Sequence, residues 1–403
     1  MTSTVETRPA TTTAERLHGL DALRAGALLL GIVLHSLLPF IPGIPWLVID
    51  TRSSELTGIP VFVIHLFRMT LFMLLAGYFG RLVLQRRGPG RYLRDRVVRI
   101  LLPFLAFWPI AVLPLGLMAM FQAEQRGEPL LLPPPTEDPL LTINPGQLWF
   151  LLVLMQCVVL TLLARALIVP ALGRERAAAV AAWCGRVFSS PAGVLVAAVP
   201  YFVALLMQGT VLGGILAPET LVPSASALTA YLGAFLVGWT LQARPDALRR
   251  IARGGPVQLG AAALFTVVGF FLSTPDSAVP LPVTAGVIAL ASWCWVYALL
   301  ALATTFLTRE RPVVRYLADA SYWMYLLHLP LLVGFELLLA PLDWPILAKL
   351  GLTWVVVGLA LLVSYHLLVR STPIGRWLNG RRYPFRLGWG GPDERRDPGS
   401  GPG

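Results

Sequence analysis

Charged residues are scarce in this chain of 403 residues: they make up 13% of it, whereas hydrophobic residues make up 56%. A soluble domain usually carries about 25% charged residues, and the mean hydropathy of +0.70 also indicates an apolar environment. The segments between the apolar blocks are too short to form a soluble domain. The composition therefore excludes an ordinary soluble protein and favours one that spans a membrane.

Cysteine is also scarce, with three residues, Cys157, Cys184 and Cys294. Their spacing matches no metal-binding pattern, and two of them lie in apolar blocks. We therefore expect small buried side chains, with no disulfide framework and no metal site. The first apolar block, residues 20–40, is too long for the apolar part of a cleavable signal peptide and predicts a retained first helix.

Apolar blocks of about 20 residues, by contrast, are abundant, and this length crosses roughly 30 Å of hydrocarbon as a helix. We expect an all-α, polytopic membrane helix bundle with about ten transmembrane helices. A disordered cytoplasmic segment (1–15) precedes the membrane domain (16–370), and a basic, flexible cytoplasmic tail (371–403) follows it. The expected helices lie at 20–40, 59–84, 97–121, 147–170, 190–208, 226–243, 257–273, 281–307, 319–340 and 346–369.

The charges between the apolar blocks alternate in sign along the chain. Segments rich in arginine, such as the one with Arg86, Arg91 and Arg94, alternate with acidic ones, such as the one with Asp50 and Glu55. Because Arg and Lys accumulate in short cytoplasmic loops, this alternation predicts that both termini are cytoplasmic and that the protein lies in the cell membrane. It also explains most of the net charge of +11, so we expect no nucleic-acid partner.

Ionisable residues inside the expected helices indicate a site, because they are costly in hydrocarbon and usually face protein or water. The first helix contains Asp21, Arg24 and His35. The spacing of Arg24 and His35 places them on nearly the same helix face, about 16 Å apart along the axis. Asp21 lies at i, i+3 from Arg24 and could pair with it. Alternatively, Arg24 could extend to the cytoplasmic interface.

Two other expected helices carry further polar residues. The second helix contains His65 and Arg68, and His65 lies at nearly the depth of His35. A lone buried histidine can equally well bond a backbone carbonyl, so His65 has two readings. The ninth helix carries Ser321, Tyr325, His328 and, two turns further on, Glu336. Its first three polar residues share one face, at i, i+4 and i+7.

These residue types suit group transfer from a long carrier. Histidine moves protons near neutral pH, and arginine binds phosphate or carboxylate through a planar fork. A helix with both on one face, about 16 Å apart, fits a phosphorylated carrier with a reactive far end, such as acyl-coenzyme A. Arg96 and Arg99, at i, i+3 where a basic loop enters the third helix, could hold its phosphates. Positive-inside bias alone could explain most other charges of that loop.

Five segments resemble, in order, the motifs of the membrane acyltransferase-3 family. They are RLHGLDALRAGALLLGIVLHS with Arg24 and His35, RMTLFMLLAGYF, RDRVVRILLP with Arg96 and Arg99, QLWFLLVL, and LADASYWMYLLHLPLL with Ser321, Tyr325 and His328. The carboxyl-terminal segment YHLLVRSTPIGRWLNGRR, together with His65 and Arg68 in the second helix, resembles the branch that includes the glucan succinyltransferase of periplasmic glucan synthesis. Gln147 stands where that branch often has histidine, and the family's Gly-Val-Asp motif is absent.

The resemblance implies a membrane O-acyltransferase that moves an acyl group from cytosolic acyl-CoA to a hydroxyl of a carbohydrate or another acceptor. His35 would be the general base and His328 a second catalytic residue; a covalent acyl-His35 intermediate is an open variant. Acyl-CoA would be a substrate, with no permanently bound cofactor. Donor binding would fall to Arg24, Arg96 and Arg99. Acceptor binding or support would fall to Asp21, His65, Arg68, Ser321, Tyr325 and Glu336.

Other classes of function and partner stay open on the sequence. A transporter of a glycan or lipid-linked substrate fits the composition, although we find no clear internal repeat of the kind many transporters show. A structural subunit of an assembly complex is the third option, and a homo-oligomer is open for each. We expect no esterase-like domain after the last helix, so the acceptor would be handled by this domain or by a separate partner. Transfer from acyl-CoA by the purified protein would distinguish these classes.

Overall fold

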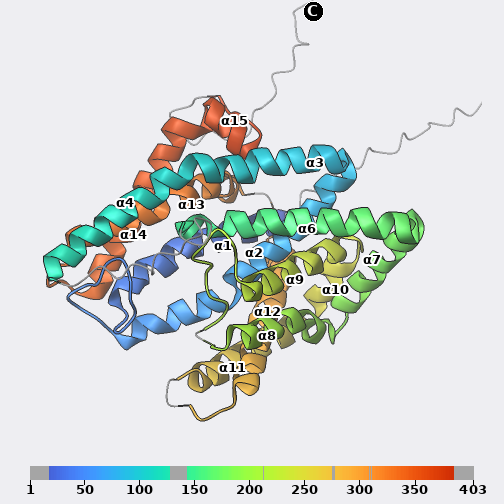
Figure 1. Ribbon diagram of the computed structural model, residues 1–403, viewed down its shortest axis with the longest axis horizontal. Coiled ribbons are helices and arrows are strands. Elements are labelled where there is room, and N and C mark those ends of the chain that lie inside the picture. Colours follow the sequence, from blue (N-terminus) through green and yellow to red (C-terminus); the bar gives the residue numbers. More distant parts are fainter. Residues whose placement is uncertain are drawn as a thin grey trace, which may run out of the picture.

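The computed structural model describes residues 18–127, 143–211, 213–274, 277–307, 309 and 311–384, and these residues form helices and connecting segments without a β-strand. The expected all-α class is confirmed (Figure 1). Residues 1–15 and 385–403, which cover the expected amino-terminal segment and most of the expected tail, lie outside the described residues.

The main helices agree with the ten ranges expected from the sequence. They are α1 (His18–Leu37), α2 (Gly58–Arg87), α4 (Leu102–Arg126), α6 (Trp149–Leu172), α8 (Gly193–Gln208), α9 (Ala225–Gln242), α11 (Gly255–Leu272), α12 (Leu281–Phe306), α13 (Pro312–Leu339) and α14 (Ile346–Ser364). Shorter helices connect or follow them: α3 (Pro89–Arg96), α7 (Arg174–Phe188), α10 (Ala247–Arg253) and α15 (Pro373–Asn379). Single turns of other helix types complete the set: Leu38–Phe40, Glu55–Thr57, Val97–Leu101, Gly146–Leu148 and Tyr365–Arg370.

Eight of the described helical segments are long and apolar enough to cross a membrane, which makes this a multi-pass membrane protein. The pair α7 and α8, bent by 98°, would form a ninth span if it crosses as one unit. By itself α8 has 16 residues, fewer than the roughly 20 that a span needs. The total of ten spans and the cytoplasmic position of both termini therefore stay predictions.

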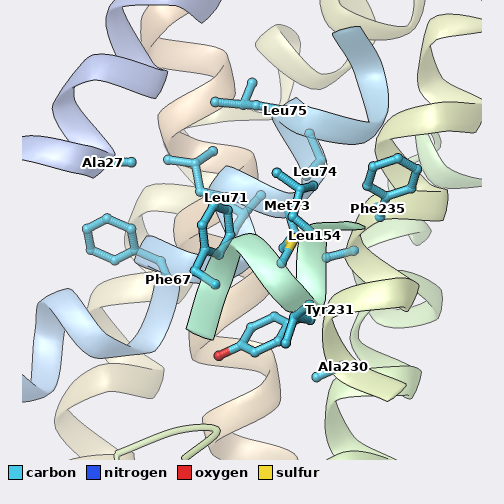
Figure 2. Packing of buried hydrophobic residues seen from close by; sticks show 14 of the residues in the cluster. Ala27, Phe67, Leu71, Met73, Leu74, Leu75, Leu154, Ala230, Tyr231 and Phe235 are labelled. Atoms are coloured by element: carbon cyan, nitrogen blue, oxygen red, sulfur yellow. The ribbon is translucent and has the colours of Figure 1, made fainter. Parts of the chain in front are cut away.

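Glycines let the central helices approach closely. Gly77 of α2 lies against the backbone carbonyl of Phe235, and Gly238 of α9 lies against that of Leu74. An added Cβ at either glycine would collide with the carbonyl oxygen, so α2 and α9 can pack backbone to backbone only because both positions lack a side chain. Figure 2 shows the buried core at this contact, with Leu74 beside Phe235.

Helix packing brings together the elements that carry the predicted site residues. α1 packs against both α2 and α13, and α13 also packs against α4 and α14. The three helices with histidines inside the bundle are therefore neighbours, although α13 is far from the other two in sequence.

The first part of the expected tail packs on the bundle. The indole of Trp377 in α15 donates a hydrogen bond to the carbonyl of Val98 (2.7 Å), and the amide of Asn379 donates to the carbonyl of Asp319 (2.8 Å). The hydroxyl of Tyr383 donates to the Asp319 carboxylate (2.8 Å). These bonds hold residues 373–383 against the turn Val97–Leu101, which precedes α4, and against the first part of α13.

Candidate functional site

Two cavities enter the bundle and share one wall. The histidine cavity, of about 590 Å³, is lined by His35, His65, Arg68 and His328 among others. The arginine cavity, of about 510 Å³, is lined by arginines from several segments. The residues that line both cavities are Leu28, Phe72, Phe150 and Tyr325. The two cavities are therefore adjacent and share these four side chains as part of their walls.

The arginine cavity contains all three predicted donor-binding residues, Arg24, Arg96 and Arg99. Asp21 also lines it, and the predicted pair with Arg24 forms at 3.4 Å. The carboxylate of Asp95 pairs with Arg96 at 2.7 Å and with Arg99 at 3.1 Å. Because one carboxylate is shared by two arginines, this cluster keeps excess positive charge, which suits a polyanionic ligand.

Further arginines reach this cavity that the sequence analysis had treated as topology signals only. Arg311 and Arg315 come from the start of α13, and Arg381 follows α15. Arg381 also pairs with Asp319, another residue of the cavity wall. No spacing in the sequence relates these arginines to Arg24, because they belong to distant segments that only the packing of α13 and α15 unites.

The histidine cavity brings together two predicted catalytic residues. The ring centroids of His35 on α1 and His328 on α13 lie 5.3 Å apart. The ring of Trp46, which the sequence analysis missed, stacks on that of His35, with ring centroids 5.6 Å apart and an interplanar angle of 11°. The ring of Tyr325 lies 6.0 Å from that of His328. His35 is therefore held between aromatic rings on two sides.

The hydrogen bond of His328 determines which of its nitrogens can accept a proton. Its Nδ1 lies 2.8 Å from the backbone carbonyl of Tyr325. A carbonyl oxygen only accepts, so Nδ1 carries the hydrogen, and in the neutral ring Nε2 keeps its lone pair. Within the described part of the chain, His328 Nε2 and His35 Nδ1 have no hydrogen-bond partner. The two rings thus offer unengaged nitrogens inside the cavity.

Arg68 belongs to α2, and its side chain lines the histidine cavity and lies against α1. Its guanidinium lies over Gly31, one turn before His35, where any side chain would collide with it. Its Nε has no hydrogen-bond partner among the residues described. His65 also lines the cavity, and its Nδ1 lies 3.4 Å from the carbonyl of Gly213. His65 thus combines the two readings that the sequence left open, a backbone contact and a place in the cavity.

Two tyrosines of α13 hydrogen-bond to neighbouring segments: Tyr325 belongs to the shared wall, and Tyr322 lines the arginine cavity. The hydroxyl of Tyr325 donates to the carbonyl of Gln147 (2.7 Å), and that of Tyr322 donates to the carbonyl of Arg99 (2.7 Å). Gln147 itself lines the histidine cavity, at the position where the resemblance described in the sequence analysis leads one to expect histidine. Ser321 lines the arginine cavity, and its hydroxyl donates to the carbonyl of Ala318.

Among the predicted site residues, Glu336 is the one that lines neither of the two cavities. It is buried on α13. Its carboxylate oxygens have no hydrogen-bond partner within the described ranges. A supporting role for Glu336 stays a prediction without a direct contact to the histidines.

Comparison with known families decides the class of this two-cavity protein. The family model Acyl_transf_3, described as an acyltransferase domain, matches residues 17–369. The chain belongs to this acyltransferase family. The match runs from α1 through α14 and ends before α15, whose Leu378 and Asn379 also line the arginine cavity. It confirms both the resemblance seen in the sequence and the enzyme class.

Known relatives of this acyltransferase carry the name glucans biosynthesis protein C. The protein of Salmonella heidelberg (strain SL476) is 26% identical over 341 residues, which cover 81% of this chain and 85% of the relative. Those of Shigella dysenteriae serotype 1 and Escherichia coli (strain K12) are 32% identical over 143 residues, and the match spans 37% of their length. No solved structure matches the chain.

Proposed function

We propose that this acyltransferase moves an acyl group from cytosolic acyl-CoA to a hydroxyl of a carbohydrate on the opposite side of the cell membrane. The observation that carries the proposal is the meeting of an arginine-lined and a histidine-lined cavity at one shared wall. The names of the relatives, which refer to glucan biosynthesis, support a carbohydrate acceptor.

The donor would bind with its phosphates in the arginine cavity. Arg24, Arg96 and Arg99 line that cavity, and because Arg96 and Arg99 share the single carboxylate of Asp95, positive charge remains for phosphate oxygens. From Arg24 to His35 the helix rises about 16 Å, the distance that the slender arm of coenzyme A would span. The arm would pass the wall of Phe72 and Tyr325, so that only the thioester enters the histidine cavity.

The acceptor hydroxyl would react in the histidine cavity. His35 takes the hydroxyl proton while the hydroxyl oxygen attacks the thioester carbonyl carbon. The resulting oxyanion collapses, the carbon–sulfur bond breaks, and the thiolate of coenzyme A receives the proton from His35. Arg68, a cation of the same cavity, is placed to stabilise the oxyanion. The products are an ester and free coenzyme A.

A two-step variant uses the same residues. His35 would attack the thioester first, forming an acyl-imidazole and releasing coenzyme A. The acceptor hydroxyl would then displace the imidazole, with the free Nε2 of His328 accepting the hydroxyl proton and passing it to the departing His35 ring, so that both histidines return to the neutral state. Rapid quenching of the enzyme with labelled acyl-CoA and no acceptor separates the routes, because only this variant leaves label on His35.

The proposal is tested in proteoliposomes with acyl-CoA on one side of the membrane and an oligosaccharide acceptor on the other. We expect release of free thiol on the donor side and one acyl ester on the acceptor per thiol released. Movement of the oligosaccharide across the membrane without thiol release would replace this proposal with the transporter alternative. Absence of both activities with a panel of acyl donors and glycans would leave the structural-subunit class.

A further inference from the structure

The segment between α1 and α2, residues 41–54, forms a loop that closes one side of the histidine cavity. Ile41, Ile44 and Trp46 of this loop line the cavity. Trp46 is also the residue that stacks on the ring of His35. The position of this loop therefore determines one of the two aromatic surfaces that hold the proposed general base.

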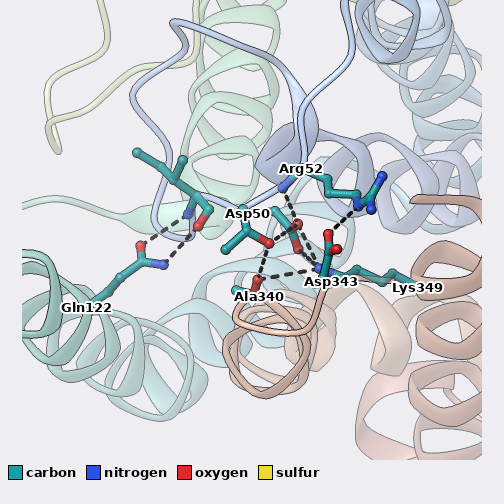
Figure 3. Close-up of polar contacts among 8 residues, drawn as sticks. Asp50, Arg52, Gln122, Ala340, Asp343 and Lys349 are labelled. Atoms are coloured by element: carbon teal, nitrogen blue, oxygen red, sulfur yellow. Dashed lines mark hydrogen bonds and ion pairs between the residues drawn. The ribbon is translucent and has the colours of Figure 1, made fainter. Parts of the chain in front are cut away.

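A buried ion pair anchors the same loop to α14. The ammonium of Lys349 contacts both carboxylate oxygens of Asp50, at 2.7 and 2.8 Å (Figure 3). The side chains are 1% and 3% exposed. Lys349 is the only lysine among the 403 residues of the chain, which otherwise uses arginine for its positive charges. No motif used in the sequence analysis contains this lysine.

Hydrogen bonds to one carbonyl at the end of α13 extend this anchor. Ala340 accepts from the hydroxyl of Thr51 (3.0 Å), from the backbone N–H of Thr51 (3.4 Å) and from the Lys349 ammonium (3.4 Å). On the amino-terminal side, the backbone N–H of Ile49 donates to the side-chain amide oxygen of Gln122 in α4 (3.2 Å), and the side-chain amide nitrogen of Gln122 donates to the Ile49 carbonyl (3.4 Å). We call Asp50, Thr51 and Lys349 with the Ala340 carbonyl the loop anchor.

Apolar packing connects the loop anchor to the catalytic helix. Val48, midway between Trp46 and Asp50, is completely buried in a cluster with Leu329 and Val333. Leu329 directly follows His328 on α13. The stretch from Trp46 to Asp50 is thus held at three points. Trp46 stacks on His35, Val48 packs on α13, which carries His328, and Asp50 pairs with Lys349.

We propose that the loop anchor is a positioning element for acyl transfer, which holds Trp46 against His35 so that the ring stays beside His328. The inference rests on the proposed function. A buried ion pair is a poor source of net stability compared with apolar side chains of similar size, because both charges lose their hydration. Its two bonds do, however, fix the direction and register of the chain that carries them. A loop that must hold the Trp46 ring against His35 needs a fixed direction and register of this kind.

The main test removes both charges together, in the double variant Asp50→Asn/Lys349→Met, so that no unpaired charge is left buried. We expect kcat to fall about tenfold, while KM for acyl-CoA stays within about twofold, because the arginine cavity is untouched. The matched control is Arg52→Gln/Asp343→Asn. This pair also joins the loop to the region before α14, at 2.6 Å, but its side chains are 48% and 82% exposed. The control should leave kcat unchanged.

A thermodynamic cycle with Trp46→Leu identifies the route of the effect. If the anchor acts through Trp46, the Asp50/Lys349 change should lower kcat by less than about twofold once Trp46 is already replaced. Independent, multiplicative losses would contradict the proposal. So would a well-folded Asp50→Asn/Lys349→Met protein with the kcat of the parent.

A milder variant keeps the test decisive if the double variant fails to insert. Thr51→Val removes one hydrogen bond at an exposed position, so the protein should fold. We expect kcat to fall about threefold with KM for acyl-CoA unchanged; an unchanged kcat would overturn the proposal. A parent protein without acyl transfer would instead refute the proposed function, so the two failures are distinguishable.

Discussion

The ring centroids of His35 and His328 lie 5.3 Å apart, although the two residues belong to α1 and α13, which are far apart in the sequence. The hydrogen bond from His328 Nδ1 to the Tyr325 carbonyl leaves Nε2 able to accept a proton. In the proposed reaction, this pair would take the proton from the acceptor hydroxyl and return it to the leaving group. The consequences for activity can be measured residue by residue.

Replacement of His35 by alanine should abolish acyl transfer while the protein still inserts. General-base catalysis contributes about 10²–10⁴-fold to rate, so kcat should fall at least about 100-fold. The measurement is thiol release from acyl-CoA in nanodiscs with a saturating acceptor. His366→Ala is the control: His366 lies near the end of α14, where Nδ1 is 3.3 Å from the Tyr316 hydroxyl, and lines neither cavity. Near-normal transfer by the His35 variant would exclude a catalytic role there.

Replacement of Arg96 by lysine should weaken donor binding although it preserves the charge. The planar guanidinium can contact Asp95 and a phosphate at the same time, whereas an ammonium is a point donor. We expect KM for acyl-CoA to rise about tenfold with a small change in kcat. Arg86→Lys, at a position outside both cavities, should be nearly silent. If variants of Arg24, Arg96 and Arg99 all bind acyl-CoA like the parent, these arginines determine topology only.

Introduction of a methyl group at Gly31 should displace Arg68 from the histidine cavity. The added Cβ would collide with the guanidinium, which is the far end of a flexible side chain and can move at little cost in stability. Gly31→Ala should therefore fold, yet lower kcat about tenfold if Arg68 stabilises the oxyanion. Gly26→Ala on the same helix adds its methyl group to open space and should retain full activity. Equal activities of the two variants would remove Arg68 from the mechanism.

Cysteine labelling should place the segment around α10 in the cytoplasm. The basic residues Arg249, Arg250 and Arg253 lie there, and such clusters stay on the cytoplasmic side. In a background without native cysteines, Arg253→Cys should resist a membrane-impermeant maleimide in intact cells and react after lysis. Ser53→Cys, in the exposed part of the loop that covers the histidine cavity, should react in intact cells. Labelling of Arg253→Cys from outside would contradict the ten-span topology.

The amino-acid sequence by itself determined the membrane class, the ten helices and the motif residues of the family. Each of these depends on local rules: the length of an apolar block, and the helical period that places Arg24 and His35 on one face about 16 Å apart. The pairing of Asp21 with Arg24 at 3.4 Å follows from the same period.

Only the tertiary structure decided which of these residues meet. Trp46 covers His35, and Arg381 joins Arg24 in one cavity, because loops and helices distant in sequence pack together. The Asp50–Lys349 pair has no sequence spacing that a motif could encode, since its partners lie on a loop and on the last long helix. Glu336 shares α13 with His328, yet the packing of that helix leaves it outside both cavities. Helical periodicity places a residue on a face, but the neighbouring helices determine what that face contacts.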